Sequence, residues 1–354
     1  MTTSEYDSYR PPEPPKRQRG NGFRRRASGW LTGRGEGRGE QALVPDAQFT
    51  SYYGRPVVKP VPWGPTIPAY LFLGGLAGGS QLLAMGAHAT GNAELRRATR
   101  LVSAAAVALS GAALVEDLGK KSRFVNMLRT LKVTSPMSVG SWILSAFSAG
   151  AMPVAVAEID RLRPLPGGGL VRAIETPAQV VGAAFATPLA SYTAVLLSNT
   201  ATPTWHAAYK ELPFVFVGSA AAASGGMAMV LTSVRAAGPA RRLAVLGVAG
   251  DLIAMRILEG RLGVEGETLH HGMPGRLTKL SMVLNVAGGL GTLVAGRSRI
   301  GAALSGAALV GASVATRFGV FEAGMESARD PRYTIEPQRQ RLAARQGKDS
   351  ITTA

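Results

Sequence analysis

Residues 70–86 read YLFLGGLAGGSQLLAMG, an apolar run without a charged side chain. A helix needs about 20 mainly apolar residues to cross the hydrocarbon core of a bilayer. Two overlapping G-x-x-x-G pairs start at Gly74 and Gly75, and such pairs let helix backbones approach closely in a membrane. The stretch therefore predicts a membrane-spanning helix over about residues 65–90.

Similar apolar blocks recur along the chain, and charged residues crowd between them. By length, breakers and charge boundaries we expect further helices over residues 98–118, 136–159, 177–198, 212–234, 241–258, 277–296 and 300–318. The sequence thus predicts an all-α membrane protein with eight transmembrane helices. An even number places both chain ends on one face of the membrane, which we name the tail side.

Composition excludes several classes of protein. The chain of 354 residues is 46% hydrophobic, carries a formal net charge of +17, and contains no Cys and four His. Without Cys we expect no iron–sulfur cluster, and with His only at helix ends and in loops we expect no haem. The basic residues are spread over both faces of the predicted membrane domain, so we expect no nucleic-acid binding.

The predicted domain organisation follows the same segregation of charge. Residues 1–50 are Arg-rich without a following apolar region, which predicts a disordered basic N-terminal tail rather than a signal peptide. A solvated tail and a tail that binds anionic lipid or a partner both remain open. Residues 51–325 form the eight-helix transmembrane domain, and residues 326–354 a polar C-terminal tail.

Polar side chains gather in the tail-side half of the predicted membrane domain. At 1.5 Å per residue, Tyr70 and Tyr192 lie about 7 and 9 Å from the tail side, and Asp251 lies about 10–12 Å from it. Glu116 closes the second predicted helix at that surface. A quinone head group requires hydrogen-bond donors, apolar walls and a route for protons. The two phenols can donate, and Glu116 and Asp251 are candidates for proton transfer.

Each of these assignments has a structural alternative. Tyr70 could be an interfacial aromatic residue, and Asp251 could simply pair with Arg256. We expect Glu158 to be a surface group, with the mouth of a proton path as the alternative. We also expect Trp205 to be an interfacial anchor, like Trp63 and Trp142.

The short loops opposite the tail side are rich in Arg, so the positive-inside rule places them in the cytoplasm. We therefore expect a multi-pass protein of the cell membrane with its tails on the outer side.

Residues 117–142, DLGKKSRFVNMLRTLKVTSPMSVGSW, resemble the pattern of the NrfD/PsrC family of membrane anchor subunits, the family of the polysulfide reductase membrane subunit. That pattern is an acidic-Leu-Gly step, a basic patch, a Leu-Arg step, and Ser-Pro-Met-Ser before a small residue and Trp. Residues 70–79, 192–206 and 317–339 are similar to further segments of the family.

The resemblance implies a fold of two four-helix bundles and no redox cofactor within this chain. It implies two partners, an iron–sulfur subunit with ferredoxin-like clusters and a molybdopterin catalytic subunit, and a bound quinone, with menaquinone preferred. Tyr192 matches the family's quinone-contacting Tyr. Some members place Asn and His on the head group where this chain has Ile67 and Tyr70.

In the light of this resemblance the basic loop before residue 136 is interpreted as a docking surface for the iron–sulfur subunit. The residues assigned to docking are Lys120, Lys121, Arg123, Arg129 and Lys132. Ser138 is assigned to the quinone pocket. The alternative is a loop that rests on lipid head groups.

The sequence therefore predicts a quinone-reactive membrane anchor of a molybdopterin oxidoreductase, not catalytic alone, that passes electrons between an iron–sulfur partner and a membrane quinone. Two alternatives remain: a secondary transporter or proton channel without an electron-transfer partner, and an anchor that only tethers.

Overall fold

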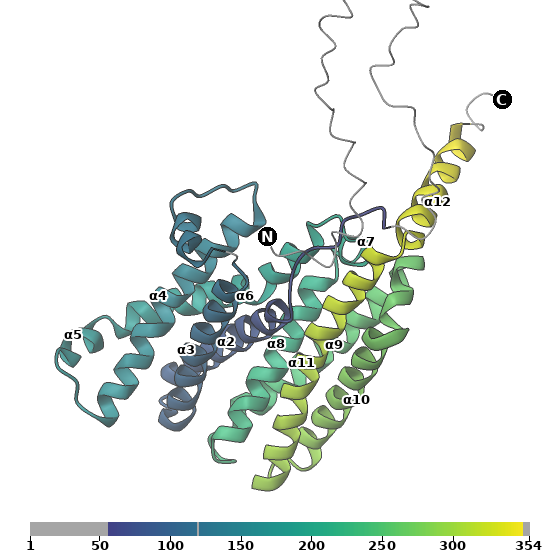
Figure 1. Cartoon of the computed structure of the whole chain (residues 1–354). Helices are drawn as coiled ribbons and strands as arrows, with labels where there is room; N and C mark the ends of the chain where they lie inside the picture. Colours follow the sequence, from purple (N-terminus) through teal and green to yellow (C-terminus); the bar gives the residue numbers. More distant parts are fainter. Residues whose placement is uncertain (1–55, 119, 350–354) are drawn as a thin grey trace, which may run out of the picture. The chain divides into compact units, whose positions relative to one another are not determined.

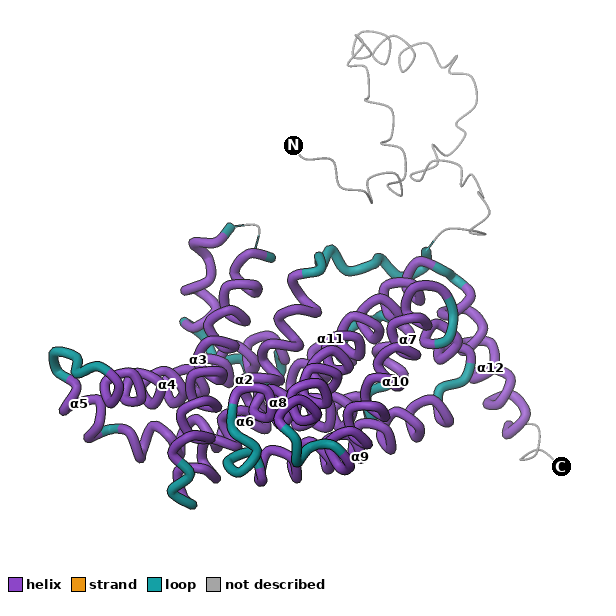
Figure 2. Tube along the Cα trace, turned by 90° about the horizontal axis from the view of Figure 1, so that it is seen from below, coloured by secondary structure: helices purple, strands orange, loops and turns teal. Residues whose placement is uncertain are grey.

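The computed structural model describes residues 56–118 and 120–349, and Figures 1 and 2 show this part of the chain as helices joined by short connections. These residues contain no β-strand, so the all-α prediction is confirmed. The predicted N-terminal tail, residues 1–50, lies outside the described residues.

Within the described residues, eight helices have 20 or more residues, and each coincides with one predicted range. They are α2 (Thr66–Ala89), α3 (Ala93–Glu116), α4 (Pro136–Leu162), α6 (Glu175–Ser198), α8 (Leu212–Leu231), α9 (Gly238–Arg261), α10 (Gly272–Val294) and α11 (Arg299–Arg329). The largest error is the end of α11, predicted at 318. Arg317 is completely buried, so charged residues there do not mark the water boundary.

Shorter helices occupy several connections and the segment after α11, and they were not predicted. They are the 3₁₀ segments η2 (Lys121–Leu128) and η3 (Val264–Leu269) and the helices α5 (Gly168–Ala173), α7 (Pro203–Ala207) and α12 (Arg332–Asp349). In Figure 1, α7 and α12 lie toward the same end of the long helices as the connection between α3 and α4, and α5 lies at the other end.

Seven of the long helices are long and apolar enough to cross a membrane. The described part of the chain is therefore that of a multi-pass membrane protein. The eighth, α9, is not among the seven, and it carries Arg241, Arg242, Asp251 and Arg256. The predicted helix over 241–258 is thus present, but its crossing of the membrane is not established by length and composition.

The long helices pack in two groups. In the first group, α2 packs on α3 and α6, and α4 packs on α3 and α6. In the second group, α8 packs on α9 and α11, and α10 packs on α9 and α11. Helix α2 also packs on α8 and α11, so it joins the two groups (Figure 1).

The small residues of α2 explain how it can touch so many neighbours. A Cβ atom at Gly78 would lie 2.6 Å from the carbonyl oxygen of Ala186 on α6, which no real Cβ tolerates. A Cβ at Gly75 would lie 3.2 Å from the Cβ of Ala220 on α8. The paired glycines of the opening motif therefore bring α2 against both groups.

Candidate functional site

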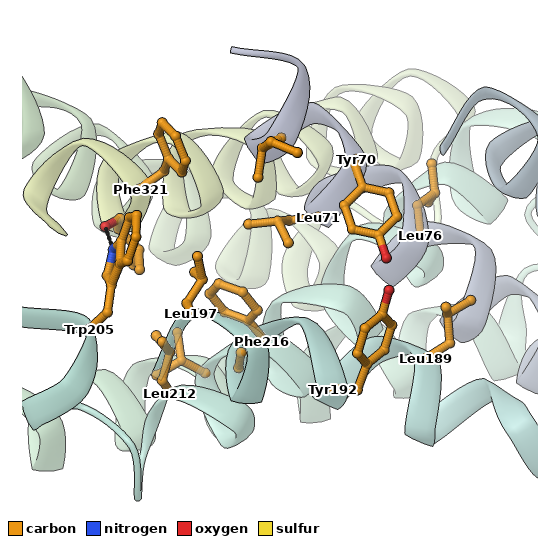
Figure 3. Packing of buried hydrophobic residues seen from close by; sticks show 14 of the residues in the cluster. Tyr70, Leu71, Leu76, Leu189, Tyr192, Leu197, Trp205, Leu212, Phe216 and Phe321 are labelled. Carbon is orange, nitrogen blue, oxygen red and sulfur yellow. Dashed lines mark hydrogen bonds between the residues drawn. The ribbon is translucent and has the colours of Figure 1, made fainter. Parts of the chain in front are cut away.

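Two buried phenols lie between α2 and α6. Tyr70 is 1% exposed and Tyr192 is 8% exposed. Figure 3 shows their rings on opposite sides of the gap between these helices, with the two hydroxyl groups pointing toward one another. The interpretation of Tyr70 as an interfacial residue is therefore wrong, because an interfacial side chain would keep its hydroxyl end in water. The structure brings together the two tyrosines that the sequence selected.

The N-terminal turn of α4 positions the ring of Tyr192. Ser135 caps this helix, since its hydroxyl accepts a hydrogen bond from the Ser138 backbone N–H, and Pro136 begins the helical turn. One turn later, Gly140 faces the ring, and a Cβ at this position would overlap ring atoms of Tyr192. The glycine of the Ser-Pro-Met-Ser-Val-Gly stretch thus provides the space that the phenol ring fills.

A groove of about 540 Å³ opens beside Tyr192, between the start of α4 and the second half of α6. Its apolar walls include Val139, Ile143 and Val195. Five residues with polar side chains also line it, Thr134, Thr187, Ser191, Tyr192 and Asn199, whereas Tyr70 does not. A volume of this size and a mostly apolar lining with a few polar groups are typical of small-molecule sites.

Ser138 does not line this groove. Its hydroxyl donates to the carbonyl oxygen of Thr130 at 3.0 Å and accepts from the backbone N–H of Lys132 at 3.0 Å. Both bonds fold the basic loop back onto the start of α4. Ser138 therefore shapes the loop, and any contact with a quinone remains a prediction.

The loop cations lie on the surface. Lys120, Arg129 and Lys132 are exposed, and Lys121 forms an ion pair of 2.5 Å with Glu116. The side chain of Arg123 lies outside the described part of the loop. The Glu116 side chain is 64% exposed and lines neither this groove nor the one beside Asp251, so the structure does not bring it to the tyrosines.

Asp251 occupies a separate place in the second group of helices. It is 2% exposed, and its Oδ2 accepts a hydrogen bond of 2.7 Å from the Asn285 side chain on α10. Asp251 therefore pairs with Asn285, and not with Arg256 as the alternative interpretation had it. Arg317, also buried in this group, donates to the carbonyl oxygen of Phe216 at 2.8 Å and stacks on its ring.

Sequence reasoning missed a buried ionic cluster in the first group. Arg100 is completely buried, and its Nη1 donates to Glu158 at 2.8 Å and to Glu175 at 2.5 Å. The expectation that Glu158 is a surface group is wrong, because three helices enclose it and Arg96 and Arg161 also contact it. The sequence did contain one indication of this cluster. Arg96 and Arg100 are four residues apart, which places both on one face of a helix.

Trp205 is another correction. It is completely buried, its ring nitrogen donates to the Val320 carbonyl oxygen at 2.8 Å (Figure 3), and its ring stacks on Trp63. An interfacial anchor would be exposed, so Trp205 instead joins α7 to α11.

Comparison with protein families gives a match to the family described as polysulphide reductase, NrfD, over residues 57–323. The chain belongs to the NrfD family. No curated protein matches it. The NrfD match extends from the segment before α2 into α11, and it includes the tyrosine pair, the groove beside Tyr192 and Asp251.

Proposed function

We propose that this NrfD-family chain is the quinone-reactive membrane anchor of a molybdopterin oxidoreductase. It passes electrons between a partner iron–sulfur subunit and a membrane quinone, menaquinone or a close relative. The observation that carries the proposal is the pair of buried phenols, Tyr70 and Tyr192, whose hydroxyls point toward one another, together with the apolar groove that Tyr192 lines.

The residues of the groove fit a quinone. The head group is a flat ring with two carbonyl acceptors, and it requires donors at one place and apolar contact elsewhere. Tyr192 supplies a hydroxyl donor, and Val139, Ile143 and Val195 supply apolar walls that suit the ring and the isoprenoid tail. Pro136 begins α4, and Pro188 lies inside α6, where a proline removes one backbone hydrogen bond of the helix.

The tyrosines and the groove then have distinct tasks. Bound quinone supplies two-electron redox chemistry coupled to protons. The Tyr192 hydroxyl donates to a head-group carbonyl and orients it, and Tyr70 is the second candidate donor from the facing helix. The walls keep water from the ring. Asp251 and Glu116 are proposed to move protons, Asp251 from inside the second group and Glu116 at the exposed end of α3.

The basic loop is proposed to receive the iron–sulfur subunit. Three exposed cations, Lys120, Arg129 and Lys132, lie on the connection that leads into α4, and α4 forms one wall of the groove. A partner bound there would hold its metal centre at the tail side. The start of α2 and the end of α6 lie on that side, and Tyr70 and Tyr192 are close to these helix ends. We also propose that α9 crosses the membrane, so that the two groups are two four-helix bundles. Eight crossings place both tails on one side, and the Arg-rich short loops favour the outer side.

Replacing Tyr192 with Phe tests the proposal. The variant keeps the ring against Gly140 and removes the hydroxyl, and we expect quinone-linked turnover to fall about tenfold, the loss of one hydrogen bond with a kinetic role. Tyr209→Phe is the matched control, since Tyr209 is 55% exposed and lies outside the groove. Unchanged quinone-linked turnover in an assembled Tyr192→Phe complex would refute the site.

Gentle purification tests the assignment of partners. Co-purification of subunits bearing iron–sulfur clusters and molybdenum supports the anchor. A chain that purifies alone and moves a solute would support a transporter instead. Charge reversal at Lys120 and Lys132 should weaken the association in a salt-dependent manner, because exposed charges act mainly through screened attraction.

A further inference from the structure

A second groove, between α9 and α10, runs from the charged end of these helices toward the middle of the second group. It has a volume of about 440 Å³ and is separate from the groove beside Tyr192, since the two share no lining residue. Arg256, Glu259 and Lys279 lie at its outer end, and apolar side chains such as Met255 and Val286 line its length. Asp251 and Asn285 lie at its inner end, about 15 Å along α9 from Arg261.

The inner end of this groove has unused hydrogen-bond acceptors. Asn285 donates to Asp251 Oδ2, which leaves Asp251 Oδ1 and the Asn285 carbonyl oxygen. Both atoms are buried, and neither has a hydrogen-bond partner among the described residues. Buried polar atoms in proteins are almost always paired, because an unpaired one loses its hydration without compensation. The charge of Arg317 acts on Asp251, but Arg317 donates to neither acceptor, its Nε and Nη1 are themselves unpaired among the described residues, and it does not line the groove. The two acceptors therefore suit a ligand that enters along the groove and brings donors.

The chemistry of the lining narrows the class of that ligand. Its body must be apolar, since Leu252, Met255, Met282 and Val286 line the groove. Its inner end must carry O–H or N–H groups, because carboxylate and amide oxygens accept and do not donate. A hydroquinone has this form, a flat apolar ring with hydroxyl donors. A quinone does not, since it has carbonyl acceptors only and would place them against Asp251 and Asn285.

We propose that the α9/α10 groove is a second ligand site, selective for the reduced form, in which a hydroquinone donates one hydroxyl to Asp251 Oδ1 or to the Asn285 side-chain oxygen. The choice of a hydroquinone among donor-bearing apolar ligands rests on the function proposed above. The two sites then differ in character, since Tyr192 offers a donor that suits the oxidised form and Asp251 offers an acceptor.

Equilibrium dialysis of the purified, fully assembled protein tests this, with a tail-less naphthoquinone as the probe in its oxidised form or in its reduced form under anaerobic conditions. We expect the reduced probe to occupy two sites per chain and the oxidised probe one. Asp251→Asn retains the shape of the side chain and should weaken the second reduced-probe site about tenfold or more, the effect of one hydrogen bond to a carboxylate.

A steric variant keeps the test independent of the polar pair. Val286→Phe narrows the groove from a lipid-facing position, and it should abolish the second site. Val283→Phe is the matched control, since Val283 is an exposed valine of the same helix that does not line the groove. It should retain both sites.

Three results would overturn the proposal: a single reduced-probe site in the wild type, equal binding of both forms in the groove, or an unchanged second site in Val286→Phe. The Tyr192→Phe variant separates this inference from the proposed function. If Tyr192→Phe leaves quinone binding intact while Asp251→Asn weakens reduced-probe binding, the tyrosine site fails and the α9/α10 site stands. If only Tyr192→Phe weakens binding, the reverse holds.

Discussion

Replacing Gly140 with Ala would place a methyl group where the ring of Tyr192 now lies. A Cβ on the existing backbone would overlap three atoms of that ring, so either the ring or the start of α4 must move. The ring is almost completely buried, and Gly140 lies in a helix that Ser135 and Pro136 fix at its first turn. We therefore expect the substitution to displace the phenol from its position opposite Tyr70.

The expected cost follows from two opposing effects. Overpacking a close-packed interior costs about 1–3 kcal/mol, whereas Gly→Ala in a helix gains about 0.5–1 kcal/mol from reduced backbone entropy in the unfolded state. The difference between these effects is a net destabilisation of roughly 0–2.5 kcal/mol, and we expect a value near the middle of that range. Thermal unfolding of the detergent-solubilised complex measures it, and quinone-linked turnover should fall in the same variant, because the phenol no longer holds its position opposite Tyr70.

Gly111→Ala is the control, since Gly111 is also helical and a Cβ there has no neighbour within 4 Å among the described residues. It should be neutral or stabilising. In the double variant Gly140→Ala with Tyr192→Ala, the added methyl has free space, so the two changes should couple by about 1–3 kcal/mol. Equal stability and turnover of Gly140→Ala and Gly111→Ala would show that the Tyr192 ring does not pack on Gly140.

Two further predictions concern charged groups. Arg100→Met should destabilise the protein by about 3 kcal/mol, because it leaves Glu158 and Glu175 buried with fewer cations, and a melting temperature equal to that of the wild type would contradict this. At the surface, the hydrogen bond from Arg261 holds the pKa of Glu211 below its usual 4.5, so this pair stabilises the fold above pH 4.5 and the effect disappears as pH falls through the folded-state pKa. Melting temperature should therefore fall less on acidification in Glu211→Gln than in the wild type, and parallel curves would refute the assignment.

The sequence was sufficient for the eight long helices and for the selection of Tyr70 and Tyr192. Blocks of about 20 apolar residues predict membrane-spanning helices, because charged side chains inside a membrane are costly. The depth of Tyr70 and Tyr192 follows from the fixed rise per residue of a helix, so their placement in one half of the membrane required no knowledge of packing. That α2 and α6 lie side by side was not contained in this reasoning, and the structure supplies it.

Two of the errors share one cause. Glu158 and Trp205 each lie near the end of a predicted helix, and each was placed at the surface or the interface by that position. Their burial depends on which neighbouring helix covers them. Arg100 on α3 pairs with Glu158 and also with Glu175 on α6. The sequence of α4 alone contains no pattern that predicts these contacts.

The different depths of the two grooves constrain how they can act together. Along their helices, Tyr70 lies about 6 Å from the start of α2 and Tyr192 about 9 Å from the end of α6, whereas Asp251 lies about 15 Å from the end of α9. A metal centre held by the proposed partner at the tail side would therefore be nearer, measured along the helices, to the tyrosines than to Asp251. Electron exchange with that centre is expected at the tyrosine groove, and a hydroquinone beside Asp251 would have to reach it by moving between the grooves. Blocking the α9/α10 groove with Val286→Phe should consequently leave the chemistry of a single turnover unchanged and alter only the supply or removal of the reduced form during steady-state turnover.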